Sequence, residues 1–244
     1  MEHKKDTKPI ISIKSLEKTY NDESGETRAL RGVSFDIMPG EFVAIMGPSG
    51  SGKSTLLHML GLLDKFTGGE YFLKGRKVEN FSDDEVAHMR NKRMGFIFQA
   101  FNLLPKASVL DNVKLPLAYS DVPEDEWFDL AKKAIDAVGM THRTYHKASQ
   151  LSVGEKQRAS IARALVNDPD IIFADEPTGN LDSRSGGIIM DIIKRLYYKG
   201  KTVVLITHET YTAEYAERII TVRDGKIESD KLVEHVRQAG EFRK

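Results

Sequence analysis

The chain has 244 residues, 40% apolar and 30% charged, which is ordinary for one large globular domain or one domain with an inserted lobe. Lysine plus arginine equals aspartate plus glutamate at 36 each, so no net basic charge favours nucleic-acid binding, although a local basic face is not excluded. The absence of cysteine excludes disulfides, thiolate metal sites and cysteine nucleophiles.

The first part of the chain favours β-structure. The opening residues, MEHKKDTKP, are charged and lack the apolar core of a signal peptide, and no apolar run approaches the roughly 18–20 residues that span a bilayer. IISIKSLEKTY and ALRGVSFDIM read as strands. With GEYFLKG they predict an antiparallel sheet over about 10–40 and 66–78. Tyr20 lies here, where an edge-strand tyrosine is the ordinary interpretation.

A phosphate-binding loop follows the first buried strand. FVAIM (42–46) predicts that strand, because strands buried on both faces read as continuous apolar runs. GPSGSGKST then matches G-x-x-x-x-G-K-[ST], and a helix is predicted over 53–62. Glycines let successive N–H groups face an anion, and the helix start adds positive partial charge. The predicted phosphate site comprises Gly47, Pro48, Ser49, Gly50, Ser51, Gly52, Lys53, Ser54 and Thr55, with Lys53 on the β- and γ-phosphates and Ser54 on Mg²⁺.

Residues of about 80–168 read as a helical lobe inserted between core strands. Helical patterns at 82–92, 124–138 and 155–167 accompany one short apolar strand, GFIF, after which Gln99 stands at a strand end. A neutral amide there can contact both Mg²⁺ and water. The residues after it form either a docking groove for a membrane partner or part of the lobe's own core; they are Phe101, Leu103 and Leu104.

QLSVGEKQ, at 150–157, reads as a helix start. Ser152 and Glu155 stand in S-x-x-E spacing and predict a capping box, which by itself accounts for the motif as a well-capped helix. Such a start also exposes N–H groups and a dipole, so it is a second anion site. One nucleotide does not need two such sites from one fold. Two copies packed head to tail would let each helix start close over the other copy's γ-phosphate.

Acidic and imidazole side chains follow the next two buried strands. IIFA precedes Asp175 and Glu176, and TVVLI precedes His208, at the strand ends where open α/β sheets present their ligands. Taken alone, two acidic residues after a strand more often mark a strand end that is exposed to solvent. Joined to the phosphate loop, Asp175 is predicted to hold Mg²⁺. Glu176, facing the opposite way because neighbouring strand residues alternate, is predicted to polarise the attacking water.

The alternation of strands and helices predicts an α/β fold with a parallel sheet. Helical patterns at 183–199 and 210–217 complete that alternation. The tail over about 229–240 predicts one further amphipathic helix through Leu232, Val233 and Val236. The whole chain, 1–244, is therefore expected to form one nucleotide-binding domain.

The ordered motifs resemble those of the ATP-binding-cassette (ABC) ATPases. Tyr20, GPSGSGKST, Gln99, LSVGEKQ, IIFADEP, GNLD and His208 cover the chain from about 10 to 228. RMGFIFQAFNLLPKASVLDNVKLPLAY and ADEPTGNLD are similar to the branch that contains lipoprotein-release and macrolide-exporter ATPases. The resemblance implies a phosphate-loop NTPase core with a parallel sheet, an N-terminal antiparallel β subdomain and an inserted helical subdomain.

The resemblance also implies a role for each matching residue. Tyr20 would stack on adenine, and Asp182 in GNLD would lie at a dimer seam. Ser152, Gly154 and the neighbouring Glu155 would serve the opposite subunit's nucleotide. The catalytic set would be Glu176, Lys53, His208 and Gln99, the Mg²⁺ ligands would be Ser54, Gln99 and Asp175, and the cofactors would be ATP and Mg²⁺.

A membrane transporter or mechanotransmission complex is the implied setting. The chain would be its ATPase subunit, a head-to-tail dimer closing on two Mg·ATP. Its partners would be a second copy and an integral-membrane permease, without nucleic acid. It would lie in the cytoplasm, on the inner face of the membrane.

Two alternatives stay open. A soluble cassette ATPase acting on DNA or ribosomes is one, although the chain has neither a long coiled-coil insertion nor a second cassette. A non-hydrolysing nucleotide-binding regulator is the other, suggested by Val153, where the family usually has glycine. Valine disfavours positive φ, so helical geometry is predicted there, with a side chain that can crowd the facing nucleotide or subunit.

Overall fold

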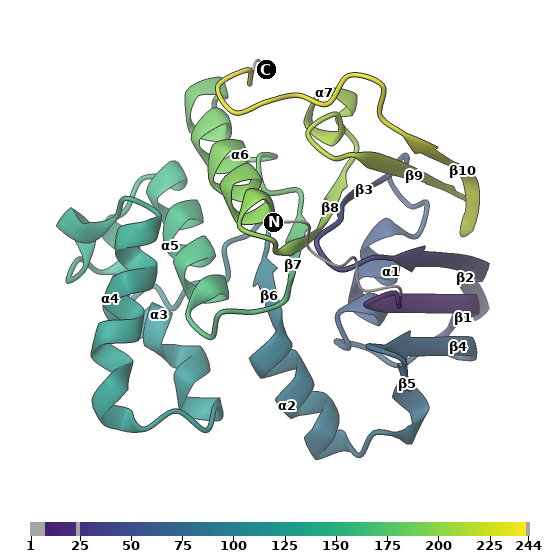
Figure 1. Ribbon diagram of the computed structural model, residues 1–244, viewed down its shortest axis with the longest axis horizontal. Coiled ribbons are helices and arrows are strands. Elements are labelled where there is room, and N and C mark those ends of the chain that lie inside the picture. The colour runs from purple at the N-terminus through teal and green to yellow at the C-terminus, as the bar shows by residue number, and fades with distance from the viewer. Residues whose placement is uncertain (1–7, 23–24, 243–244) are drawn as a thin grey trace. The chain divides into compact units, whose positions relative to one another are not determined.

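A computed structural model describes residues 8–22 and 25–242, and the chain divides into two compact units (Figure 1). The first unit comprises residues 1–86 and 197–237. The second comprises residues 87–196 and 238–244. The chain therefore leaves the first unit, builds the second, returns, and finally contributes a short segment to the second unit again.

The first unit contains a four-stranded antiparallel sheet. Its strands are β1 (Ile11–Asp22), β2 (Gly25–Ile37), β4 (Gly68–Leu73) and β5 (Arg76–Lys77), in the order β2-β1-β4-β5. Apolar side chains of β1, such as Ile11, Ile13 and Leu16, are almost completely buried. This arrangement confirms the antiparallel β-structure that the sequence predicts. A short 3-10 helix (Val78–Asn80) follows β5.

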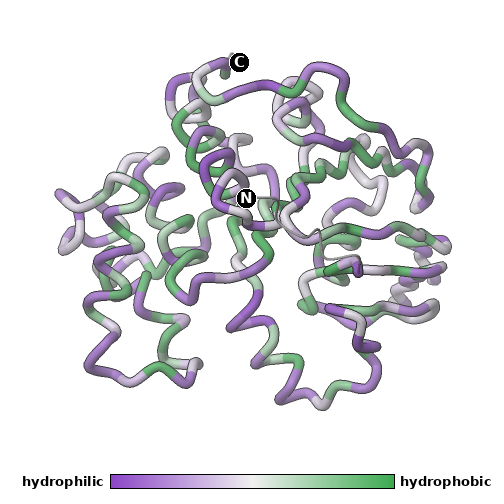
Figure 2. Tube along the Cα trace, in the orientation of Figure 1, coloured by the Kyte–Doolittle hydropathy of each residue, from purple (hydrophilic) through white to green (hydrophobic). Residues whose placement is uncertain are grey.

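Parallel strands in the same unit carry the phosphate loop. β3 (Phe42–Met46) lies between β8 (Thr202–Thr207) and β9 (Arg218–Arg223) and is parallel to both. Every residue of β8 is buried, as the apolar run predicts, and Figure 2 shows the hydrophobic colouring of these strands. Helices α1 (Lys53–Leu60) and α7 (Thr210–Ala213) follow β3 and β8 in the chain.

The prediction of an amphipathic helix over about 229–240 is wrong. Residues 226–232 instead form β10 (Lys226–Leu232), antiparallel to β9. The connecting residues Asp224 and Gly225 have φ of 50° and 77°, and an Asp-Gly pair with positive φ at both positions is a strong hairpin turn. The turn determines the structure here because the alternation in KIESDKL suits a half-buried strand and the few apolar residues do not sustain a helix.

The second unit combines two parallel strands with helices. β6 (Met94–Ile97) pairs with β7 (Ile171–Asp175), and Phe96 stacks on Phe173 with ring centroids 5.4 Å apart. The helices are α3 (Val109–Lys114), α4 (Trp127–Ala137), α5 (Val153–Leu165) and α6 (Ser183–Tyr198), while α2 (Asp83–Arg93) runs from the first unit into the second. Short 3-10 helices span Leu115–Tyr119, Glu124–Glu126, Thr141–Arg143 and Ala148–Gln150.

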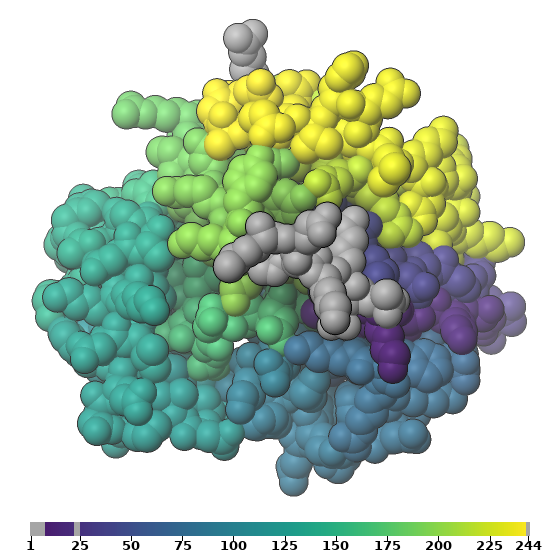
Figure 3. All heavy atoms as spheres, viewed as in Figure 1, coloured from purple at the N-terminus to yellow at the C-terminus, as the bar shows by residue number. Residues whose placement is uncertain are grey.

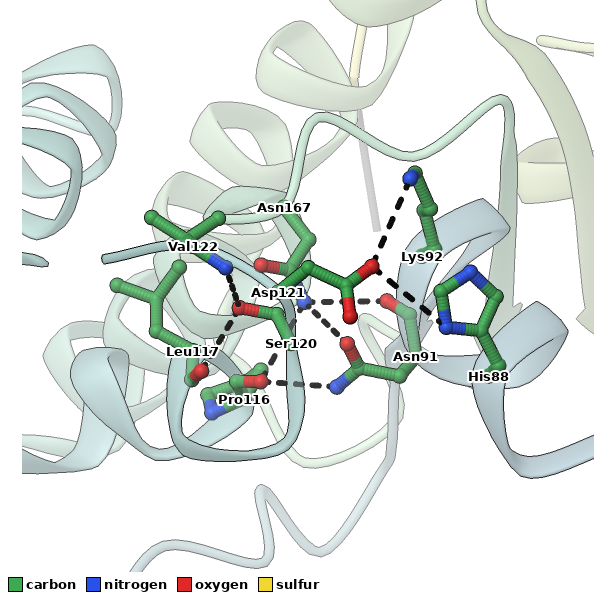
Figure 4. A network of polar contacts seen from close by, with 9 residues as sticks. All are labelled: His88, Asn91, Lys92, Pro116, Leu117, Ser120, Asp121, Val122 and Asn167. Atoms are coloured by element: carbon green, nitrogen blue, oxygen red, sulfur yellow. Dashed lines mark hydrogen bonds and ion pairs between the residues drawn. The ribbon is translucent and has the colours of Figure 1, made fainter. Parts of the chain in front are cut away.

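Asparagine side chains connect α2 to the segment that follows α3 (Figure 4). The Asn91 amide donates to the Pro116 carbonyl at 2.8 Å, and the Asn167 amide donates to Oδ1 of Asn91 at 3.0 Å. Oδ2 of Asp121 lies 3.9 Å from Nδ1 of His88 and 3.9 Å from Nζ of Lys92, both on α2. These contacts fix α2 against the helical part of the second unit.

No helix within the described residues is both long enough and apolar enough to cross a bilayer.

Candidate functional site

The loop between β3 and α1 has a backbone that requires glycine. Gly47, Gly50 and Gly52 have φ of 153°, 77° and 101°. A Cβ at Gly47 would lie 2.1 Å from the carbonyl oxygen of Val222, and a Cβ at Gly52 would lie 2.5 Å from that of Ala29. Since both obstacles are backbone atoms, no side-chain movement could relieve the overlap. The loop therefore folds closely against β9 and β2, as a phosphate-binding loop needs.

Polar atoms in this loop fit an anion. The Ser51 hydroxyl is buried and has no hydrogen-bond partner among the described residues. The Lys53 ammonium is also buried and donates to the Pro48 carbonyl at 2.8 Å, inside the loop. The Gly52 N-cap brings no capping side chain to α1, and no acidic residue stands in the first turn. Free N–H groups, a helix dipole and an ammonium converge here, which is the donor set for a triphosphate.

Tyr20 lies beside the end of the phosphate loop. Its hydroxyl donates to Asp64 at 3.0 Å and is also hydrogen-bonded to the Thr55 side chain. The Lys18 ammonium lies 4.6 Å from the ring centroid and 2.9 Å from the Asp64 carboxylate. Partial burial, reinforced by Asp64, raises the pKa of Tyr20. The structure therefore brings Tyr20 to the loop with a cation over its ring; stacking on adenine stays a prediction.

His208 and Gly47 follow neighbouring strands at one sheet edge. β3 and β8 run parallel, and their last residues, Met46 and Thr207, are register partners. His208 is exposed, and the Thr207 hydroxyl accepts from the N–H of Glu209, two residues further along the chain, at 3.0 Å. The first unit thus assembles the phosphate loop, Tyr20 and His208, all from segments that the sequence singled out.

Glu176 does not belong to the preceding strand. β7 ends at Asp175, and Glu176 has φ of 45°, in the left-handed region. The alternation of strand residues therefore does not explain the different direction of Glu176, and that part of the prediction is wrong. A turn directs Glu176 instead, with the Gly179 N–H donating to the Glu176 carbonyl at 3.0 Å. A non-glycine residue in this conformation is costly and often marks a functional site.

Gln99 lies against the turn that follows Glu176. A Cβ added at Gly179 would lie 2.8 Å from Nε2 of Gln99, so the amide occupies the space that this glycine leaves. The Asn180 amide donates to the Gln99 backbone carbonyl at 3.1 Å. The second unit therefore joins the loop after β6 to the loop after β7. Sequence reasoning singled out Gln99 but missed Asn180, whose only signal was its place in the GNLD motif.

The start of α5 has the predicted capping box. The Ser152 hydroxyl accepts from the Glu155 N–H at 3.3 Å, and the Glu155 carboxylate accepts from the Ser152 N–H at 2.9 Å. Arg143 also donates to Glu155 at 2.9 Å. Burial opposes ionisation of Glu155, but the Ser152 N–H and the Arg143 guanidinium outweigh it and lower its pKa to about 2. Arg143 is a second residue that sequence reasoning missed.

Gly154 connects the start of α5 to the start of α6. A Cβ at Gly154 would lie 2.9 Å from the Ser185 hydroxyl. Ser185 in turn donates to Asp182 through its N–H at 2.8 Å and its hydroxyl at 3.0 Å, and these bonds lower the pKa of Asp182. Asp182 and Gly154 thus share one neighbour. Val153 begins α5 with helical backbone, as predicted, and its side chain is 46% exposed.

Two further α5 side chains hold the loops around this site. Gln157 is fully buried and donates to the Pro177 carbonyl at 3.0 Å, directly after Glu176. Arg163 donates to the Phe101 carbonyl at 2.7 Å and to the Asn102 carbonyl. Phe101 and Asn102 both have left-handed φ, 60° and 51°. Sequence reasoning assigned no role to Gln157, which appeared only as the last residue of LSVGEKQ, or to Arg163, because their partners are backbone atoms of distant loops.

The predicted docking residues are not part of a closed core. Leu104 is half exposed, and Phe101 and Leu103 are partly exposed. They follow Gln99 directly. This exposure favours the docking interpretation over the lobe-core interpretation, and docking itself stays a prediction.

Comparisons with known proteins agree on one family. The family model described as ABC transporter matches residues 30–179. The macrolide export ATP-binding/permease protein MacB of Bdellovibrio bacteriovorus is 50% identical over 226 residues, which is 92% of this chain and 34% of that protein. This chain therefore spans about a third of the length of that relative. An uncharacterized ABC transporter ATP-binding protein of Thermotoga maritima is 45% identical, over 91% of this chain and 94% of its own length.

Solved structures of similar fold include dimers. The dimeric structure of MJ0796, a bacterial ABC transporter cassette, has a TM-score of 0.84 and 43% identity, covering 91% of this chain and 98% of that chain. A dimeric post-hydrolysis state of the same cassette, bound to ADP and Pi, also has a TM-score of 0.84, with 42% identity and the same coverage. The expected fold class, with its antiparallel β subdomain and helices, is thereby confirmed.

Proposed function

Because the chain belongs to the ABC transporter family of ATP-binding cassettes, we propose that it is the ATP-hydrolysing subunit of a membrane transporter or mechanotransmission complex. The observation that carries the proposal is the phosphate loop, with its glycine-dependent backbone, its inward Lys53 ammonium and its buried Ser51 hydroxyl, which has no hydrogen-bond partner in the part of the chain that the structure describes. An integral-membrane permease would complete the machine. The chain would then act in the cytoplasm, on the inner face of the membrane.

The phosphate loop holds the triphosphate in this proposal. The Lys53 ammonium and the backbone N–H groups of residues 47–55, except Pro48, which has none, bind the phosphate oxygens after Lys53 exchanges the Pro48 carbonyl for phosphate. Ser54, Gln99 and Asp175 are the oxygen-bearing side chains that would hold Mg²⁺, a cation that prefers oxygen ligands. Mg²⁺, when bound, neutralises phosphate charge. Tyr20 orients the base.

Glu176 accepts a proton from the attacking water. His208 and Gln99 orient that water and the γ-phosphate. Phosphoryl transfer depends mostly on positioning and charge stabilisation, so side chains fixed on loop turns suit this task. The turn at Glu176–Gly179 and its contact with Gln99 support this assignment.

Two copies complete each nucleotide site. In the proposed head-to-tail dimer, Ser152 and Gly154 at the start of α5 face the γ-phosphate held by the other copy's loop. Asp182 lies at the seam. The capped, outward helix start of α5 supports this arrangement, and so do the dimeric cassettes of similar fold. Loss of the γ-phosphate on hydrolysis would open the dimer, a population shift that ATP reverses.

Substituting Glu176→Gln tests the enzyme proposal. The variant keeps the size and hydrogen-bonding of the side chain but cannot take the proton, so we expect ATP turnover to fall by about 10²-fold or more while ATP still binds. Steady-state phosphate release and binding of a fluorescent ATP analogue measure the two properties. Glu228→Gln, an exposed change in β10, is the control.

Equal turnover in wild type and Glu176→Gln would remove Glu176 as the base. An absence of turnover in the wild type, with ATP bound, would favour a non-hydrolysing regulator instead. A stable ATP-dependent dimer of the Glu176→Gln variant, detected by sedimentation velocity, is the further expectation. A variant that stays monomeric at saturating Mg·ATP would contradict the two-copy site.

A further inference from the structure

Residues Gln238–Phe242 return to the second unit and lie on the start of α6. The Gly240 N–H donates to Oδ1 of Asp191 at 2.8 Å. A Cβ at Gly186 would lie 2.7 Å from Cε1 of Phe242, and one at Gly187 would lie 3.3 Å from its Cβ. Figures 1 and 3 show this last segment, in yellow, over the green first turns of α6. The phenylalanine therefore fills the notch that two adjacent glycines leave.

The same turn of α6 carries Asp182 and Ser185. The Gly186 N–H donates to the Asp182 backbone carbonyl at 2.8 Å, and the Ser185 N–H donates to the Asp182 carboxylate. On its other side, Ser185 packs against Gly154 of α5. The first turn of α6 thus lies between the start of α5 and the ring of Phe242.

This turn is intrinsically weak. Glycine is a poor helix former because it loses the most backbone entropy on folding, and two glycines stand side by side here. The missing side chains also leave the helix without apolar contacts on that face. The Phe242 ring supplies those contacts, and the Gly240–Asp191 hydrogen bond holds the segment that carries the ring.

We propose that Phe242 is a positioning residue for the part of the nucleotide site that one copy lends to the other. It acts through the first turn of α6, which orders Asp182 and supports Gly154. The inference rests on the proposed function, because it presumes that Asp182 and the α5 start meet a second copy. Phe242 lies outside all of the motifs that the sequence shares with the family.

The experiment compares dimer closure with nucleotide binding in full-length chains carrying Glu176→Gln. The substitutions are Phe242→Ala, Gly186→Ala and both together, and Leu232→Ala is the control because that side chain is 79% exposed. Sedimentation velocity with saturating Mg·ATP gives the dimer dissociation constant. Titration of a fluorescent ATP analogue into dilute protein gives the affinity of the phosphate loop. The rate of amide hydrogen exchange at residues 182–188 reports how stable the first turn of α6 is.

Phe242→Ala should raise the dimer dissociation constant several-fold and speed exchange at 182–188, with the ATP affinity of dilute protein unchanged. Gly186→Ala should do the same, because its methyl group displaces the ring. The double variant should be no worse than Phe242→Ala, since no ring remains to displace and alanine favours the helix. Leu232→Ala should change none of these values.

An unchanged dimer dissociation constant for Phe242→Ala, in a background that does dimerise, overturns the positioning role and leaves the proposed function standing. Additive losses in the double variant overturn it too, because two independent defects would then be at work. A matching loss of ATP affinity in dilute protein would assign Phe242 to general folding instead. Failure of the Glu176→Gln parent to dimerise removes the proposed two-copy site and this inference with it.

Discussion

Glu155 shows how one carboxylate can serve a helix start at the scale of a single residue. It accepts from the Ser152 N–H and from Arg143, and its pKa falls to about 2, against 4.5 for the free side chain. A carboxylate whose folded pKa is depressed stabilises the fold above its unfolded pKa, and that contribution is lost as the pH falls through the folded value. The relevant window therefore runs from about 4.5 down to about 2.

Glu155→Gln should lower the free energy of unfolding at pH 7 by about 1 kcal/mol, since glutamine keeps a cap hydrogen bond but loses the charge. The difference from wild type should stay constant down to about pH 4.5 and shrink steadily below it. Urea unfolding at a series of pH values measures this. A difference that is independent of pH would show that the charge of Glu155 adds no stability.

Helix α5 organises the second unit at the scale of elements. Its first turn caps itself through Ser152, its middle holds the Pro177 carbonyl through Gln157, and its last turn holds the loop after Gln99 through Arg163. One rigid helix thus connects the predicted second anion site to the turn that carries Glu176 and to the Gln99 loop. A displacement at the start of α5 would be transmitted to both loops.

Arg163→Lys should loosen the Gln99 loop. Lysine keeps the charge but cannot donate to two carbonyls as a planar fork, so residues 101–102 lose one of their bonds in a costly left-handed conformation. We expect a loss of about 1–2 kcal/mol in unfolding free energy, faster hydrogen exchange at 99–104 and several-fold slower ATP turnover. Arg158→Lys on the same helix is the control. Unaltered exchange at 99–104 would show that Arg163 does not hold this loop.

Elements with strong local signals were predictable from the sequence. The four buried strands and the helices α2, α4, α5 and α6 lie within a few residues of their predicted positions, because apolar runs and caps specify them locally. α3, β9 and β10 were missed: α3 has only six residues, and the Asp224–Gly225 turn outweighed a weak helical pattern. The motif residues were predictable, whereas Arg163, Asn180 and Phe242 act on distant backbone, which no local pattern reports.

At the scale of the whole molecule, the residues predicted for one nucleotide belong to both units. The first unit holds the phosphate loop, Tyr20 and His208, and the second holds Gln99, Asp175 and Glu176. A ligand that binds the folded chain and not the unfolded one stabilises the fold. Linkage makes the gain grow with ligand concentration, to about 2.7 kcal/mol at a hundredfold excess over Kd.

Mg²⁺ and ATP together should raise the Tm by more than ATP with a chelator does. Ser54→Ala should remove most of that Mg²⁺-dependent increment, because its hydroxyl is the proposed metal ligand within the loop. Thermal unfolding followed by circular dichroism measures both conditions. Ser229→Ala, in β10, is the matched hydroxyl deletion. If Ser54→Ala keeps the full increment, Ser54 is not a ligand of the metal.

Because Glu176 has a left-handed backbone, a substitution at this position can do damage in two ways: it can disturb the turn, or it can remove the carboxylate. Side chains branched at Cβ would oppose the turn itself, whatever their charge, while asparagine and glycine would accept it. Glutamine alters the chemistry with little change in shape. In a complete series of substitutions at position 176, the activity of each variant would therefore depend on how well the new residue accepts the left-handed backbone as well as on its acidity. Loss of activity in a valine variant would say nothing about proton transfer.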